Sequence, residues 1–202
     1  MPQQLLKTIF GFDSFRPLQQ QIIDHTLQYQ DSVVLMPTGG GKSLCYQIPA
    51  LYCEGCALVV SPLISLMQDQ VTQLKQLGVA AEVLNSSLTS AEQRQVFDRL
   101  HSGQLKLLYV SPERLMMDGF LDRLPPLSLI AIDEAHCISE WGHDFRESYR
   151  QLGKLKDYFP TVPLIALTAT ATERVLADIK SLLSIEEAPV FRGSFNRKNL
   201  FY

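Results

Sequence analysis

The chain has 202 residues, of which 46% are hydrophobic and 19% charged, and its formal net charge at pH 7 is −3. These values exclude a disordered or fibrous protein, and the length accommodates one sizeable domain. The acidic balance argues against a chain that coats nucleic acid by bulk electrostatics, so any nucleic-acid contact must be local.

The chain carries no pattern for a membrane or for export. No apolar run approaches the roughly 18 residues of a membrane span, and the opening MPQQLLKTIF has no charged-then-apolar signal architecture. We therefore expect a cytoplasmic location without a membrane partner. Cys53 and Cys56 form a C-x-x-C, but no second pair of cysteines or histidines stands at zinc spacing. We interpret them as buried or incidental thiols.

Short apolar segments alternate with helical patterns along almost the whole chain. Near-continuous apolar strands separated by helices indicate a parallel sheet covered on both faces. We therefore predict an α/β fold with a mostly parallel central sheet and helices on both faces. The predicted strands are residues 32–36, 57–61, 81–85, 105–110, 127–132, 163–168 and, more weakly, 188–192.

Start signals place helices between these strands. Pro17 is expected to open a helix, since proline is favoured in a first turn. Ser90 with Gln93, and Thr170 with Glu173, match the capping-box pattern before two later helices.

Polar clusters follow five of the predicted strands. In an open α/β sheet, ligands bind at the carboxyl ends of the strands. We therefore expect one functional edge that carries all five clusters. They are PTGGGKS, SPLIS, SPER, DEAH and TATAT, in chain order.

The stretch MPTGGGKS has the residues of a phosphate-binding loop. Its glycines at 39–41 let the backbone turn tightly and point N–H groups at an anion. Lys42 can then reach the β- and γ-phosphates, and the Ser43 hydroxyl can ligate Mg²⁺. The strict pattern has glycine where this chain has Met36, and the alternative is a simple glycine turn before a helix. The position between a strand and a helix favours the phosphate loop.

A phosphate loop needs a carboxylate to complete its metal site. Asp133 and Glu134 follow a buried strand directly. Asp133 is the natural Mg²⁺ partner, and Glu134 can orient or deprotonate the water that attacks the γ-phosphate. A lone Asp-Glu pair would be interpreted as a solvated loop, but here the preceding strand and the phosphate loop favour nucleoside triphosphate hydrolysis.

These motifs together resemble a known family. TGGGKS, DEAH at 133–136 and TAT at 168–170 resemble the first motor lobe of superfamily 2 helicases. The pattern L-x-x-x-F-G-x-x-x-F-R-x-x-Q over residues 6–19 and the stretch CISEWGHDFR over 137–146 narrow the resemblance to the RecQ family of DNA helicases. The resemblance covers essentially the whole chain and implies a RecA-like P-loop NTPase lobe.

The resemblance implies an adenine site near the N-terminus. Gln19 would hydrogen-bond the base edge, since an amide offers a donor and an acceptor side by side. Phe12 and Arg16 would pack or stack near the ring. The alternative for Phe12 and Phe15 is core packing, which we favour for Phe15 only. The implied ATP-binding residues are Phe12, Arg16, Gln19, Thr38, Gly39, Gly40, Gly41, Lys42 and Ser43.

The resemblance also implies that the loop after DEAH senses single-stranded DNA. Trp141 and Phe145 are suited to stacking on unpaired bases, or alternatively they pin the loop to the core. His143 would relay between this loop and the ATP site, and His136 would join the catalytic group Lys42, Asp133 and Glu134. Thr170 is expected to couple hydrolysis to DNA movement or to cap a helix. The implied DNA-contacting or coupling residues are Ser61, Pro62, Ser111, Trp141, His143, Phe145, Arg146, Thr168 and Thr170.

The implied function is that of an ATP-dependent 3′–5′ DNA helicase in recombination and repair. Its cofactors would be ATP and Mg²⁺, its partners single-stranded and partly duplex DNA, and its place a bacterial-type cytosol or nucleoid. Residues 1–192 would be the ATP-binding domain, and 193–202 the start of the junction to a missing second lobe. Translocation needs two lobes that close around nucleotide, so we expect this chain alone to be inactive as a helicase.

Two other functions compete with this interpretation. An RNA helicase would share the DEAH motif. The N-terminal motif (residues 6–19) and the aromatic loop (residues 141–146) argue against this function. A non-catalytic module that ATP switches between binding states would be expected to have lost Lys42, Asp133 or Glu134, and all three are intact.

Overall fold

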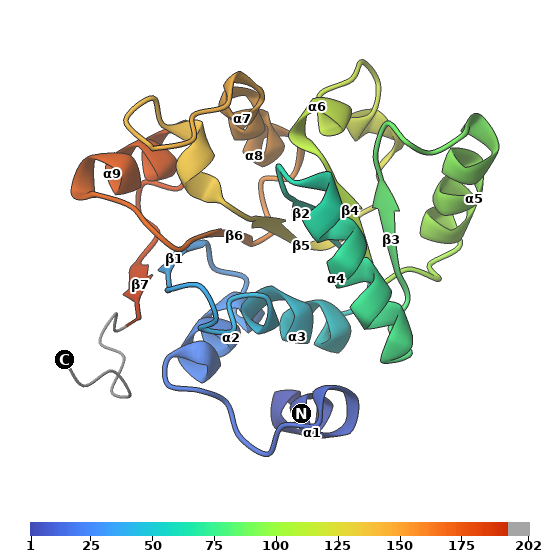
Figure 1. Ribbon diagram of the computed structural model, residues 1–202, viewed down its shortest axis with the longest axis horizontal. Helices are drawn as coiled ribbons and strands as arrows, with labels where there is room; N and C mark the ends of the chain where they lie inside the picture. The colour runs from blue at the N-terminus through green and yellow to red at the C-terminus, as the bar shows by residue number, and fades with distance from the viewer. Residues whose placement is uncertain (194–202) are drawn as a thin grey trace.

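A computed structural model of the chain describes residues 1–193 (Figure 1). Its strands form one seven-stranded sheet in the order β3-β4-β2-β5-β6-β1-β7, and each adjacent pair within this part of the chain is parallel. All seven predicted strands are confirmed. They are β1 (Ser32–Leu35), β2 (Cys56–Val60), β3 (Ala81–Leu84), β4 (Leu107–Val110), β5 (Leu127–Ile132), β6 (Leu164–Thr168) and β7 (Val190–Arg192).

Helices cover both faces of this sheet, as predicted. On one face α2, α3 and α4 contribute apolar side chains to a buried cluster, and on the other α5 to α9 do so. The α-helices are α1 (Pro2–Phe10), α2 (Gln19–Leu27), α3 (Leu44–Tyr52), α4 (Ile64–Gln76), α5 (Ser90–His101), α6 (Pro112–Leu115), α7 (Glu147–Arg150), α8 (Lys154–Tyr158) and α9 (Glu173–Leu182). Short 3-10 helices are η1 (Leu121–Arg123), η2 (Ala135–Ile138) and η3 (Gln151–Gly153).

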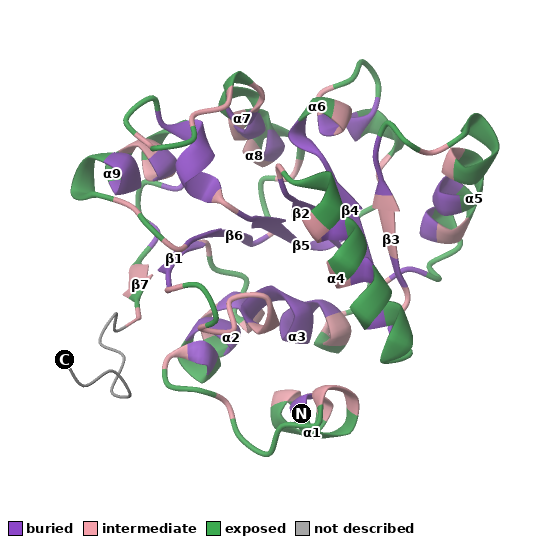
Figure 2. Ribbon diagram, in the orientation of Figure 1, coloured by how far each residue is buried: buried purple, intermediate pink, exposed green. Residues whose placement is uncertain are grey.

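Each central strand supplies both buried clusters at once. In β2, Leu58 and Val60 join the cluster under α5 to α9, whereas Ala57 and Val59 join the cluster under α2 to α4. Successive side chains of a strand point to opposite faces, so a strand covered on both faces is apolar at most positions. The buried polar exceptions are Ser32 in β1, Ser128 in β5 and Thr168 in β6. The buried strands in Figure 2 show this continuous burial.

Helix α1 forms an outer layer on the side of the sheet that α2 and α3 cover. Leu6 packs with Ile23 of α2 and Ile48 of α3 in a separate small cluster, and Figure 1 shows α1 beyond those two helices. This packing holds the segment between α1 and α2 close to the loop that follows β1.

Helix α2 begins two residues later than predicted. Residues 17 and 18 form a turn, and Leu18 has a φ of 77°, a left-handed conformation that a right-handed helix excludes. Gln19 is therefore the first helical residue.

Both predicted capping boxes were placed wrongly. The box before α5 is formed by Thr89 and Glu92, one residue earlier than Ser90 and Gln93. Helix α9 is capped by the Thr172 hydroxyl, which accepts a hydrogen bond from the backbone N–H of Val175 at 3.3 Å, so Thr170 is not the cap. In both cases the true cap is the last extended residue before the helix.

Three further predictions concern membrane helices, the cysteine pair and the C-terminal junction. No helix within residues 1–193 is long and apolar enough to cross a membrane. Cys56 is buried in β2 and Cys53 is partly buried, and both are free thiols. The predicted junction at 193–202 lies, apart from Gly193, outside the described residues.

Candidate functional site

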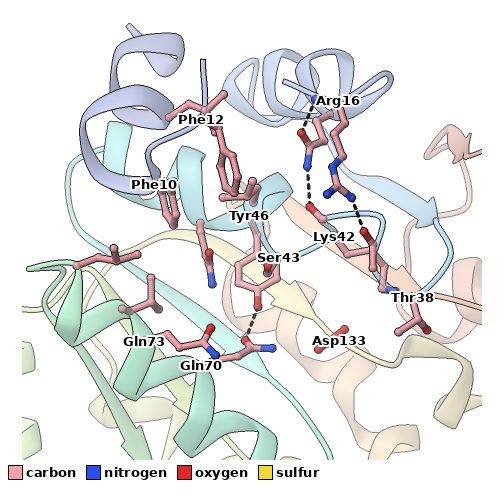
Figure 3. A pocket seen from close by; sticks show the side chains of 18 of the residues that line it. Phe10, Phe12, Arg16, Thr38, Lys42, Ser43, Tyr46, Gln70, Gln73 and Asp133 are labelled. Atoms are coloured by element: carbon pink, nitrogen blue, oxygen red, sulfur yellow. Dashed lines mark hydrogen bonds between the residues drawn. The ribbon is translucent and has the colours of Figure 1, made fainter. Parts of the chain in front are cut away.

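A cavity of about 540 Å³ opens at the carboxyl end of β1 (Figure 3). The segment between α1 and α2, the loop after β1, the first turn of α3, one side of α4 and the carboxylates after β5 line it together. The sequence motifs for phosphate, metal and adenine thus meet in one cavity, although they are far apart in the chain.

The loop after β1 has a shape that needs glycine. Gly41 has a φ of 81°, and a Cβ there would collide with Nε2 of Gln19. A Cβ on Gly40 would lie 2.9 Å from the carbonyl oxygen of Pro37. This compact backbone leads directly into α3, whose N-terminal N–H groups favour an anion.

Lys42 and Ser43 stand at the junction of loop and helix, and both line the cavity. The Lys42 ammonium donates to the carbonyl oxygen of Met36 at 3.1 Å. It is therefore held across the loop, beside the space that a phosphate would fill.

Two acidic side chains face this loop from the end of β5. Burial, and then the neighbouring Glu134 carboxylate, raise the pKa of Asp133 to about 6, while Lys42 acts in the opposite direction. The backbone N–H of Glu134 donates to Asp133 Oδ1 at 3.0 Å. Tyr149 fixes the turn by donating its hydroxyl hydrogen to the Asp133 carbonyl at 2.8 Å.

This donor set fits Mg²⁺. The Ser43 hydroxyl and the Asp133 carboxylate, both lining the cavity, are the hard oxygen ligands that Mg²⁺ prefers. Burial and the neighbouring Glu134 carboxylate raise the pKa of Asp133, so a bound cation would stabilise the ionised carboxylate.

Gln19 ties the N-terminal segment to the phosphate loop. Its side chain is buried; its Oε1 accepts from the Arg16 backbone N–H at 2.7 Å, and its Nε2 donates to the Gly41 carbonyl at 3.0 Å. The Arg16 guanidinium also donates to the Gly39 carbonyl. Both ends of the Gln19 amide are thus engaged within the protein, and each end keeps capacity for one further hydrogen bond.

The two phenylalanines of this segment differ in position. Phe12 is 53% exposed and lines the cavity, where a ring could stack on it. Phe15 packs against the small cluster under α1, as the core-packing interpretation predicted. Thr38 is exposed at the cavity rim.

His136 connects the acidic pair to the segment after β6. Its Nδ1 lies 2.8 Å from Thr168 Oγ1 and 3.3 Å from a Glu134 carboxylate oxygen. The Thr168 hydroxyl donates to the Thr170 carbonyl at 3.1 Å, so it accepts from His136, and Nδ1 carries the hydrogen. Burial lowers the pKa of His136, which favours the neutral ring. A continuous chain of contacts therefore runs from Glu134 to Thr170.

The aromatic loop lies on the surface rather than in the core. Trp141 is 60% exposed, and the Arg174 guanidinium lies 3.3 Å from its ring centroid. Phe145 is 5.5 Å from the Arg150 guanidinium, and neither aromatic belongs to a buried cluster of the described residues. The alternative that both rings pin the loop to the core is therefore not supported.

Two other loop residues hold it to the DEAH segment. The His143 ring stacks on His136, with centroids 4.3 Å apart and planes 14° from parallel. The Arg146 backbone N–H donates to the Cys137 carbonyl at 2.8 Å. The structure thus brings His143 to His136, as the relay interpretation requires.

The two serines expected to touch DNA are not surface residues. Ser61 is buried at the end of β2, and Ser111 is buried with its hydroxyl accepting from the Arg114 N–H as the cap of α6. Pro62 is half-buried. All three lie at the expected edge of the sheet but do not line the cavity.

One wall of the cavity was not predicted from the sequence motifs. Tyr46, Gln70 and Gln73 line it, and the Tyr46 hydroxyl donates to Gln70 Oε1 at 2.9 Å. Figure 3 shows Gln70 and Gln73 across the cavity from Lys42 and Thr38, with Tyr46 beside Ser43. The only available signal was the position of α4 immediately after the polar cluster that follows β2.

Comparisons with known proteins find helicases by sequence. The sequence profile of the DEAD/DEAH box helicases matches residues 16–179. The chain is 55% identical to the ATP-dependent DNA helicase RecQ of Pasteurella multocida and 54% identical to that of Haemophilus influenzae. Both matches cover 98% of this chain and 32% of the relative. The chain thus spans about a third of the length of these relatives.

Solved structures share the fold at low identity. The helicase domain of Pyrococcus furiosus Hef matches with a TM-score of 0.70 and 20% identity, over 92% of this chain and 39% of that one. The helicase MrfA bound to DNA and AMPPNP matches with a TM-score of 0.72 and 17% identity, over 96% and 29%. These matches confirm the RecA-like α/β architecture.

Proposed function

Because the chain belongs to the DEAD/DEAH box helicase family, we propose that it is the ATP-binding lobe of a RecQ-type ATP-dependent DNA helicase. The observation that carries this proposal is the single cavity that joins the phosphate loop, the Asp133–Glu134 pair and the N-terminal segment. Identities of 54–55% to RecQ helicases support the same assignment.

ATP would lie along the cavity with its base toward Phe12 and Arg16. Its phosphates would lie in the loop before α3, where Lys42 exchanges the Met36 carbonyl for a phosphate oxygen. Mg²⁺ held by Ser43 and Asp133 would neutralise charge on the β- and γ-phosphates.

Glu134 is the base of the proposed hydrolysis. Its carboxylate orients the attacking water and accepts a proton as the new oxygen–phosphorus bond forms and the bond to the leaving ADP breaks. His136 holds this carboxylate through Nδ1, at 3.3 Å. The same nitrogen contacts Thr168, so a shift of Glu134 on hydrolysis would be transmitted to the segment after β6.

DNA would bind outside the cavity, along the edge that carries the aromatic loop. Trp141 is exposed for stacking on an unpaired base, and Arg174 already covers one face of its ring. His143, on His136, links this loop to the catalytic pair. The buried hydroxyls of Ser61 and Ser111 would reach a phosphate only after a local rearrangement.

The whole protein's activity is proposed as 3′–5′ unwinding of partly duplex DNA in recombination and repair, in the cytoplasm or on the nucleoid. The chain spans 32% of its bacterial relatives, and we propose that a second lobe supplies the remaining catalytic groups. Phosphoryl-transfer enzymes gain about 10³–10⁵ in rate from an arginine delivered in this way.

A nucleotide titration tests the ATP site directly. We expect Lys42→Ala to weaken binding of a fluorescent ATP analogue in Mg²⁺ by about 10- to 100-fold, since a charge-assisted hydrogen bond contributes about 1.5–3 kcal/mol. The matched control is Lys154→Ala, an exposed lysine at the start of α8. Equal affinity of both variants and the wild type would contradict the proposed site.

A further inference from the structure

Three metal-ligand side chains converge beside the catalytic pair without taking part in nucleotide binding. His136 and Cys137 lie in η2, and Asp144 reaches them from the aromatic loop. Their ligand atoms all lie within 4.8 Å of one another. His136 Nε2 is 3.7 Å from Cys137 Sγ, which is 3.8 Å from Asp144 Oδ2.

These separations match the edges of a tetrahedral metal site. Zinc bonds of roughly 2.0 Å to nitrogen or oxygen and 2.3 Å to sulfur place neighbouring ligands about 3.5 Å apart. The two separations from Cys137 Sγ, 3.7 Å to His136 Nε2 and 3.8 Å to Asp144 Oδ2, are within a few tenths of an ångström of that value. All three ligand atoms lie within 4.8 Å of one another, so side-chain shifts alone can close the site.

The histidine is already oriented for this role. Its Nδ1–H is used by Thr168, which leaves the Nε2 lone pair directed at the thiol side. Metal-binding histidines characteristically donate their other ring hydrogen to an oxygen acceptor in this way. The stacked His143 ring further fixes the plane of the imidazole.

We propose that His136, Cys137 and Asp144 form a binding site for a zinc-class divalent cation, with a water molecule as fourth ligand. The Cys137 thiol releases its proton to solvent as the metal–sulfur bond forms, so the thiolate and the Asp144 carboxylate together balance the two charges of the ion. A thiolate ligand selects zinc over Mg²⁺, which separates this site from the one formed by Ser43 and Asp133.

Solvent reaches this site through Asp144, whose carboxylate is paired with the Arg146 guanidinium. Cys137 is buried, but Asp144 is half-exposed and opens the site to solvent. The Arg146 guanidinium lies 3.4 Å from Asp144, and the two side chains are 32% and 50% exposed, so solvent screens this ion pair in part and a metal would have to displace it.

A bound ion would join the DEAH segment to the aromatic loop. At present side-chain stacking and a backbone hydrogen bond connect these segments. A metal bridge would fix the loop against η2, and its occupancy would regulate how far the loop can move toward DNA. This inference does not depend on nucleotide binding by the chain.

Cobalt substitution tests the site, since Co²⁺ bound by a thiolate gives a sulfur-to-metal charge-transfer band. We expect one equivalent of Co²⁺ to produce this band in the metal-free chain, and one equivalent of Zn²⁺ but not excess Mg²⁺ to remove it. Cys137→Ser should abolish the band. Asp144→Asn, at an exposed position that folding tolerates, should weaken Zn²⁺ binding in a chelator competition by about tenfold or more.

Cys53→Ser is the matched control, because Cys53 and Cys56 form the other candidate thiol site. It should keep both the band and the affinity. A band that survives in Cys137→Ser but is lost in Cys53→Ser would assign the metal to the C-x-x-C and overturn the proposal. Unchanged Zn²⁺ affinity in Asp144→Asn, or no band in the wild type, would also overturn it.

Discussion

At the scale of single residues, Asp133 carries the largest electrostatic cost of the site. It is a buried carboxyl next to a second carboxylate, with Lys42 as the opposing charge. Its pKa of about 6, against an ordinary value of 3.8, means that the folded chain binds this proton more tightly than the unfolded chain. Folding stability is therefore lost as pH rises from about 4 through 6, the reverse of a salt-bridged aspartate.

We predict that Asp133→Asn stabilises the metal-free chain at pH 7. The difference in pKa corresponds to about 3 kcal/mol in the free energy of unfolding. The gain should be much smaller at pH 4, where wild-type Asp133 is almost fully protonated in the folded state and partly protonated in the unfolded state. Urea unfolding in the presence of a chelator, at both pH values, measures it. The control is Asp118→Asn, an exposed position, and a gain that is the same at pH 4 and pH 7 would refute the electrostatic explanation.

At the scale of elements, two threonines near the start of α9, Thr170 and Thr172, fit the cap pattern equally well in the sequence. The structure assigns the cap to Thr172. We predict that Thr172→Ala destabilises the chain by about 1 kcal/mol, because it leaves the Val175 N–H without its side-chain acceptor. Thr170→Ala keeps the backbone contacts with Thr168 and should cost less. Chemical unfolding of both variants measures the difference, and a larger loss for Thr170→Ala would assign the cap to Thr170 instead.

The elements themselves were largely predictable from sequence, and their ends were not. The strands β1, β2, β4, β5 and β6 are buried along their whole length, so a near-continuous apolar run marks each of them. A cap depends instead on which residue is the last extended one, and several threonines and serines near a helix start fit the same pattern. Leu18 shows the same limit, since its left-handed backbone follows from a turn rather than from its side chain.

The parts of the site that are formed by consecutive residues could be predicted from the sequence. The phosphate loop and the Asp133–Glu134 pair each occupy a few consecutive residues, and the structure brings them to one cavity. The wall made by Gln70 and Gln73 and the contact of Arg174 with Trp141 depend on how helices pack. No short pattern encodes such packing, so these partners emerge only from the fold.

At the scale of the whole molecule, the described residues contain one RecA-like unit. We predict that Mg-ATP turnover by this chain stays at background and is not stimulated by single-stranded DNA, since closure of the site would require the proposed second lobe. Steady-state phosphate release, with and without DNA, measures this. The comparison sample is the same chain extended through a second lobe, in which DNA should stimulate turnover. Strong stimulation in the short chain would show that one lobe suffices, or that two copies complete each other.

The order of strands also constrains how the protein emerges from the ribosome. β1 pairs with β6 on one side and β7 on the other, and both partners are made near the end of the described chain. The apolar strand that leads into the phosphate loop therefore has no neighbouring strand until β6 has been made. Such unpaired strands favour aggregation, and pairing across long sequence separations is slow. The nascent chain is accordingly expected to need chaperone protection until β6 and β7 have been translated.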